Sequence, residues 1–199
     1  MKKLIATLFI LSTTLLYAAE KLEEITLNSC VTFNTLCAKC HEGQCSRRLT
    51  FNTGSEAASN HIKRYSEDSD ISKKTVEEFF TLLNFMKKEC LLYMPQNAKY
   101  NQNNLASFAT STYKEYFIPL GLLKKGDYSL WIKTQEDNPF DVKIISKGFD
   151  SYLDISVCQS LKKREFGFKV DEDSDYFLRI KSKKPLHLEI LEIKEVSTK

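Results

Sequence analysis

The sequence predicts an α+β protein in which an N-terminal all-α domain is followed by a C-terminal antiparallel β-sandwich. The first observation is a helical repeat of apolar residues within 73–90. The second is a series of short segments after about Tyr116, rich in aromatic and β-branched residues and separated by turn formers. This change of period predicts two domains, residues 20–115 and residues 116–199. The hydrophobic content of 42% is enough to bury a core.

Residues 1–19 have the layout of a secretory signal peptide. Lys2 and Lys3 precede an uncharged apolar run from Leu4 to Tyr17, and small residues follow at Ala18 and Ala19. The run is shorter than the roughly 20 residues that span a bilayer. An uncleaved membrane anchor is the alternative, because the residues just before the cut are poor matches to the small residues expected there. The layout predicts bacterial export to the periplasm, with no membrane span after cleavage.

The charge balance argues against a nucleic-acid partner. The formal net charge is +3, and loss of the two lysines in residues 1–19 leaves a chain close to neutral. A nucleic-acid-binding surface needs a marked excess of basic residues. An exported chain also meets an oxidising compartment, so its six cysteines are permitted to form disulfides.

Helices are expected at several places in residues 20–115. An apolar face that includes Leu27 and Val31 predicts a helix before Cys37. Residues 73–90 predict a long helix with Ser72 as its N-cap, and residues 104–115 predict a weaker one. The apolar repeat of the long helix is formed by Val76, Phe79, Phe80 and Leu83.

The most specific motif is Cys37-Ala38-Lys39-Cys40-His41, a C-x-x-C-H sequence. In an exported protein this spacing indicates covalent attachment of a c-type haem. Two cysteines three positions apart on a helical turn lie on one side and can form thioethers with the two vinyl groups of a porphyrin. The following histidine then lies under the ring and can bind the iron. A zinc site or a thioredoxin-like dithiol is the alternative, but the sequence lacks a second ligand pair and a βαβ pattern.

On this motif the chain resembles the monohaem c-type cytochromes of the class I type, over roughly residues 25–115. The resemblance implies one covalently bound haem c, held by Cys37 and Cys40, with His41 as an axial ligand. It also implies an all-α cytochrome c-like fold for residues 20–115 and a role as a periplasmic electron carrier rather than an enzyme. The expected partners are a quinol-oxidising membrane component and a periplasmic terminal reductase, for example a molybdenum S- or N-oxide reductase.

The second axial ligand has more than one candidate. In the cytochromes that the chain resembles, a methionine ligand lies on a loop between two helices and is often followed by proline. Met94 precedes Pro95 and lies between the two segments expected to be helical. His61 is the alternative, because it shares a predicted apolar helix face with Ile62 and is expected to point inward. Met86 or an open position also remains.

The other cysteines and two arginines are candidates for supporting roles. Cys45 and Cys90 are the favoured disulfide pair, although four remaining cysteines allow three pairings. Arg47 and Arg48 are possible partners of the haem propionates, since carboxylates bind cationic side chains through charge-assisted hydrogen bonds. Solvent-exposed arginines would explain the same residues equally well.

Residues 116–199 carry no haem motif or nucleotide loop. Six segments in them are expected to be strands: DYSLWIKT, FDVKIISK, YLDISV, REFGFKV, DYFLRIKS and LHLEILEIK. Their aromatic residues, including Trp131, are expected in the core. The predicted function is that of an electron carrier with a docking or stabilising β-domain. Two alternatives are a haem-based enzyme or ligand-binding protein with an open iron site, and a binding module with an accessory haem.

Overall fold

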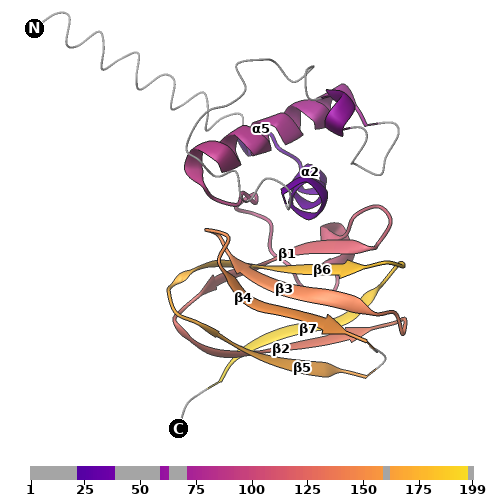
Figure 1. The fold of residues 1–199 in the computed structure, drawn as a ribbon, viewed down its shortest axis with the longest axis vertical. Coiled ribbons are helices and arrows are strands. Elements are labelled where there is room, and N and C mark those ends of the chain that lie inside the picture. Colours follow the sequence, from indigo (N-terminus) through magenta and orange to yellow (C-terminus); the bar gives the residue numbers. More distant parts are fainter. Residues whose placement is uncertain (1–21, 39–58, 63–70, 159–161, 197–199) are drawn as a thin grey trace, which may run out of the picture.

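The structure, a computed structural model, describes residues 22–38, 59–62, 71–158 and 162–196. Most of this part of the chain is a sandwich of two β-sheets, and a small helical layer covers one of them (Figure 1). The predicted fold class, with an all-α cytochrome c-like domain before the sandwich, is wrong. The described residues contain a single long helix, and its apolar face packs on a short helix and not within a helical bundle.

The sandwich contains seven strands in a four-stranded and a three-stranded sheet. The sheet orders are β1-β6-β3-β4 and β5-β2-β7, and all paired strands are antiparallel. The strands are β1 (Glu115–Leu123), β2 (Gly126–Thr134), β3 (Phe140–Ser146), β4 (Ser151–Val157), β5 (Arg164–Val170), β6 (Ser174–Ser182) and β7 (Leu188–Glu195).

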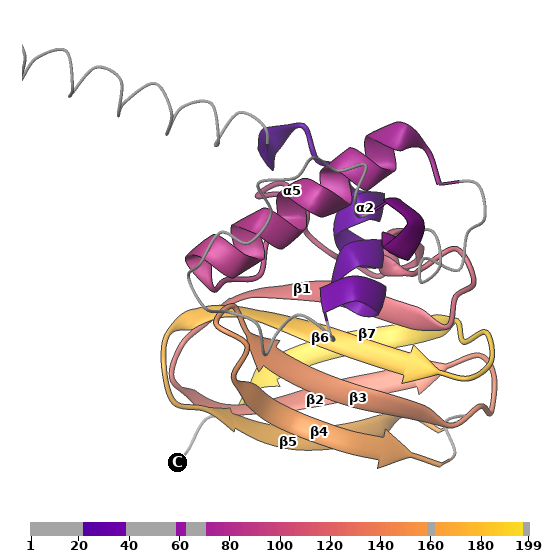
Figure 2. The ribbon, with the colours of Figure 1, turned by 45° about the horizontal axis from the view of Figure 1, so that its top comes forward.

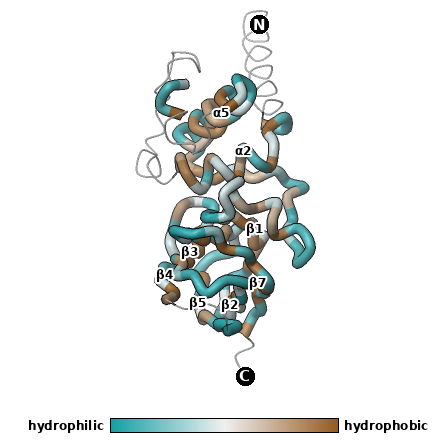
Figure 3. Tube along the Cα trace, turned by 90° about the vertical axis from the view of Figure 1, so that its right-hand side faces the viewer, coloured by the Kyte–Doolittle hydropathy of each residue, from teal (hydrophilic) through white to brown (hydrophobic). Residues whose placement is uncertain are grey.

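Alternation of side chains along the strands builds the core between the sheets. In β2, for example, Tyr128, Leu130 and Ile132 point inward and are almost fully buried. Figure 3 shows the corresponding changes between apolar and polar residues along the chain. On its other face, the four-stranded sheet buries Phe117 and Phe177, whose rings stack with centroids 5.1 Å apart. The helical layer lies against β1, at one edge of this sheet (Figure 2).

The helical layer begins with α2 (Leu27–Thr32), which continues as the π-helix η1 (Phe33–Cys37). The long helix α5 (Lys73–Glu89) starts at Ser72, whose hydroxyl accepts a hydrogen bond from the Thr75 amide at 3.1 Å, as the sequence predicted. Together with short flanking segments, these helices bury a second apolar cluster, separate from the core of the sandwich. Among the described residues it contains Ile25, Cys30, Phe33, Ala38, Ile62, Val76, Phe79, Leu82, Leu83 and Met86.

The prediction of a helix at 104–115 is also wrong. Only the 3₁₀ helix η3 (Leu105–Phe108) forms there. The Asn104 side chain instead bonds to nearby backbone, accepting from the Asn101 amide at 2.7 Å and donating to the Lys99 carbonyl at 2.9 Å. Tyr113 then adopts a positive φ of 53°, and β1 begins two residues later. These turns reverse the chain before a second helical turn can form.

Candidate functional site

The described part of the C-x-x-C-H motif lies at the end of the helix formed by α2 and η1. Cys37 is the last residue of η1, is half-buried, and packs against the second apolar cluster. Its thiol is reduced, and Ala38 after it is buried. Lys39, Cys40 and His41 lie outside the described residues, so the remainder of the predicted site is not placed. The motif therefore starts at the end of a helix whose two ends are both held by hydrogen bonds, through Thr26 to α5 and through Asn34 to Tyr93.

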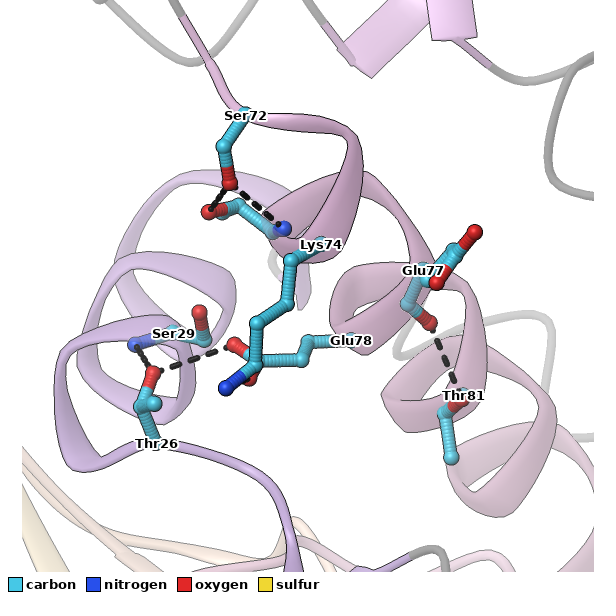
Figure 4. A network of polar contacts seen from close by, with 8 residues as sticks. Thr26, Ser29, Ser72, Lys74, Glu77, Glu78 and Thr81 are labelled. Atoms are coloured by element: carbon cyan, nitrogen blue, oxygen red, sulfur yellow. Dashed lines mark hydrogen bonds and ion pairs between the residues drawn. The ribbon is translucent and has the colours of Figure 1, made fainter.

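A polar network fixes the start of this helix to α5 (Figure 4). Thr26 is the N-cap: its hydroxyl oxygen accepts from the Ser29 amide at 3.2 Å and donates to Glu78 at 3.0 Å. Glu78 is only 8% exposed, and Lys74 lies 3.8 Å from its other carboxylate oxygen. Because Thr26 satisfies both the helix end and a buried carboxylate, it fixes where the helix starts relative to α5.

The end of the same helix is tied to the segment that contains Met94. The Asn34 side-chain amide is buried and donates to the carbonyl of Cys30 at 2.9 Å and to that of Tyr93 at 3.1 Å. Asn34 is one helical turn before Cys37, and Tyr93 directly precedes Met94. Cys37 and Met94 both pack against the second apolar cluster. The contacts thus bring one thioether candidate to the same cluster as the first motif cysteine.

The two other candidate iron ligands lie in different surroundings. Met86 is 2% exposed on the inner face of α5, where it fills the second apolar cluster. His61 is exposed, while its neighbour Ile62 is buried. The expectation that His61 points inward is therefore wrong. The single helical turn that is described at 59–62 buries the isoleucine in preference to the histidine, as the cost of desolvating an imidazole favours.

The cysteines outside the motif differ in state and environment. Cys90 is disulfide-bonded, and its partner lies outside the described residues, as does Cys45. Cys30 and Cys158 are reduced, the first fully buried and the second exposed at the end of β4. Burial, together with the nearby Glu78 charge, raises the pKa of Cys30 to about 12. Since the thiolate is the reactive form, Cys30 is a structural, unreactive thiol.

Two residues of the sandwich have surroundings that the sequence did not predict. Trp131 is on the outer face of the three-stranded sheet and not in the core, with Lys194 and Lys163 5.0 and 5.5 Å from its ring centroid. Arg179, in contrast, is on the outer face of the four-stranded sheet and is only 6% exposed, and it lines a pocket together with Thr35 of η1. Alternation along a strand identifies its two faces but does not tell which of them another layer covers.

Arg47 and Arg48 lie outside the described residues. Within the described ranges, no three His, Cys, Asp or Glu side chains are grouped so that they could hold a metal ion. In that same part of the chain, no helix is long and apolar enough to cross a membrane.

Comparisons with known proteins do not assign this chain to a family. No protein-family model matches the chain, and no curated protein matches it. Solved structures that resemble it include "CBM4 structure and function" (14% identity, TM-score 0.32), with 44% of this chain and 64% of that chain covered. Another is "BiXyn10A CBM1 APO" (14% identity, TM-score 0.33), with 44% and 68% covered. A third is "EclA C-terminal domain; sugar-binding protein" (17% identity, TM-score 0.28), with 42% and 69% covered.

These likenesses are too low to support a functional conclusion. The match spans less than two thirds of the first of these structures. The functional argument consequently rests on the residues of this chain.

Proposed function

We propose that this protein is an exported electron carrier with one haem c, attached through Cys37 and Cys40 and bound axially by His41. The observation that supports the proposal is the C-x-x-C-H motif, which begins with a half-buried cysteine at the end of an anchored helix. The described residues fit such a group: Cys37 is half-buried beside apolar side chains, and the Met94 thioether packs against the same cluster. The motif alone carries the proposal, since the fold is not that of a cytochrome c.

The haem, when bound, supplies a one-electron change at its iron. The residues of the chain hold and surround it. Cys37 and Cys40 would form the thioethers, and the second apolar cluster would exclude water from one side of the ring. Met94 is the favoured second axial ligand, since the Asn34–Tyr93 hydrogen bond keeps its segment next to the motif helix, whereas His61 is exposed. The proposed partners are periplasmic redox proteins, a quinol-oxidising component on one side and a terminal reductase on the other.

The carrier role is tested by redox titration of the purified protein, followed by its visible spectrum. We expect one reversible one-electron transition, no binding of carbon monoxide by the reduced form, and a thioether-to-iron charge-transfer band in the oxidised form. Loss of that band in Met94→Ala, but not in His61→Ala, would identify the second ligand. Rapid binding of carbon monoxide by the unaltered protein would instead favour an enzyme or a ligand-binding haem protein.

The proposal also predicts a disulfide. A thioether at Cys40 removes that residue from disulfide formation, and Cys30, Cys37 and Cys158 are reduced. We therefore expect Cys45 to be the partner of the disulfide-bonded Cys90. Peptide mapping of the mature protein without reductant should yield the Cys45–Cys90 crosslinked pair. A Cys40–Cys90 pair would be incompatible with attachment of haem at Cys40.

A further inference from the structure

A pocket of about 510 Å³ lies where the chain passes from α5 to the β-sandwich (Figure 1). Its walls come from the end of α5, from the segment 92–99, from β1 and from β6. Most of the lining is apolar, and it includes the rings of Phe85, Tyr93, Tyr176 and Phe177. Pockets of this size with mainly apolar and aromatic walls are suited to small organic molecules.

Hydrogen bonds and a ring contact fix the walls of this pocket. The Leu92 amide donates to the Lys147 carbonyl at 2.9 Å, and the Lys147 amide donates to the Asp175 carbonyl at 2.8 Å. These two bonds tie the segment after α5 to the sandwich. The Tyr93 ring packs edge-on to the Phe85 ring, with the two centroids 5.6 Å apart. The pocket is therefore built into the fold, and a ligand would not have to order its walls.

A β-bulge in β1 places a leucine at the rim of the pocket. Pro119 and Gly121 pair with successive residues of β6, so β1 carries one extra residue between them, and Gly121 has a φ of 83°. Leu122 comes next, lines the pocket and is 67% exposed. Among the described residues, the only other exposed large apolar side chain is Val196. An apolar ligand in the pocket would cover Leu122 and remove its surface from water.

The charges of the pocket favour an anionic group at its rim. Lys147 is paired with Asp175, whose Oδ2 atom lies 3.4 Å from the ammonium group. Lys99 also lines the pocket and is exposed, and it forms no ion pair within the part of the chain that the structure describes. An anion beside Lys99 would therefore meet a cation without a competing carboxylate, whereas a cationic ligand would be repelled.

We propose that this pocket binds a small apolar carboxylate, with its hydrocarbon body against Leu122 and the aromatic rings and its carboxylate beside Lys99. The walls exclude water from the hydrocarbon, and the exposed rim leaves the charged end hydrated. The inference goes beyond the proposed function and does not rest on it, since none of these contacts involves the C-x-x-C-H motif. Met94 lines the pocket as well, so the test is made with and without haem.

Isothermal titration calorimetry of the purified protein compares decanoate, decan-1-ol and decylammonium, which share one apolar chain and differ in charge. We expect one saturable site that binds decanoate most tightly and decylammonium least tightly. The charge reversal Lys99→Glu should weaken the binding of decanoate by roughly three- to tenfold, as expected for an exposed charge pair, and should leave the binding of decan-1-ol unchanged. Leu122→Ala should instead weaken the binding of all three compounds by a similar factor, because it shortens the apolar wall.

Lys183→Glu and Val196→Ala are the matched controls. Lys183 is exposed and follows the end of β6 that is remote from Asp175, and Val196 is exposed after the end of β7. Both variants should bind decanoate as the original chain does. Absence of a saturable site in the original chain would overturn the proposal. So would a Lys99→Glu variant that loses affinity for decanoate and decan-1-ol alike.

A second arm asks whether haem itself fills the pocket. The haem-free Cys37→Ser/Cys40→Ser protein is titrated with decanoate beside the original chain, and we expect equal affinities. Binding of decanoate by the haem-free variant alone would show that haem occupies the pocket, and would overturn the proposal. A colourless original chain that binds decanoate would contradict the carrier function and leave this inference intact.

Discussion

Replacing Cys37 and Cys40 together by serine is expected to abolish haem attachment completely. Serine cannot form a thioether, and no other pair of cysteines in the chain has the C-x-x-C-H arrangement. The purified variant should be colourless, and its denatured polypeptide band should not stain for haem. The original chain, produced in the same host, should retain its stain after denaturation, because a covalent link survives unfolding.

A cysteine outside the motif provides the control for this result. Cys158 is reduced and exposed at the end of β4, so serine at this position removes a thiol without disturbing the core. Cys158→Ser should carry the same amount of haem as the original chain. Haem staining that persists in Cys37→Ser/Cys40→Ser, or that disappears in Cys158→Ser, would contradict the assignment of the motif.

The second large effect, a loss of free energy of unfolding, is expected from the substitution Phe79→Ala in α5. The Phe79 side chain is 1% exposed and its ring centroid is 6.2 Å from that of Phe33, so it joins α5 to the helix that carries Cys37. Truncating a fully buried phenylalanine leaves a cavity and typically lowers the free energy of unfolding by about 3–5 kcal/mol. We expect a loss of this size in urea unfolding followed by circular dichroism.

Leu122→Ala is the matched control for this substitution. Leu122 is 67% exposed, so its truncation removes little buried surface, and the free energy of unfolding should change by roughly 0.5 kcal/mol or less. If Phe79→Ala were as stable as Leu122→Ala, the second apolar cluster would not be what holds the motif helix in place.

The parts of the fold that local patterns determine were predictable from the sequence. The N-cap Ser72 and the apolar repeat of Val76, Phe79 and Leu83 are local features, and α5 begins where they indicate. The six segments named as strands correspond to β2–β7. The first strand, β1, was missed because EYFIPLGLL does not alternate and contains Pro119 and Gly121. Its residues from Glu115 to Ile118 are all buried, because β1 lies between the sandwich core and the helical layer.

The arrangement of the helical layer could not be predicted in the same way. The five-residue motif indicates a cofactor, but the same motif does not fix the fold around it. Arg179 is buried and lines one pocket with Thr35, a residue more than a hundred positions away, and no local pattern indicates this neighbourhood. The hydrogen bond from Asn34 to the Tyr93 carbonyl, which places Met94 near the motif helix, also joins residues far apart in the sequence and could not be predicted from local patterns.

The intact mass of the mature protein, measured under denaturing conditions after production in a host that attaches haem c, tests the central claim most directly. The account predicts the mass of the processed polypeptide plus one haem, with the characteristic absorbance in the same fraction. A colourless protein with the mass of the polypeptide alone would contradict it.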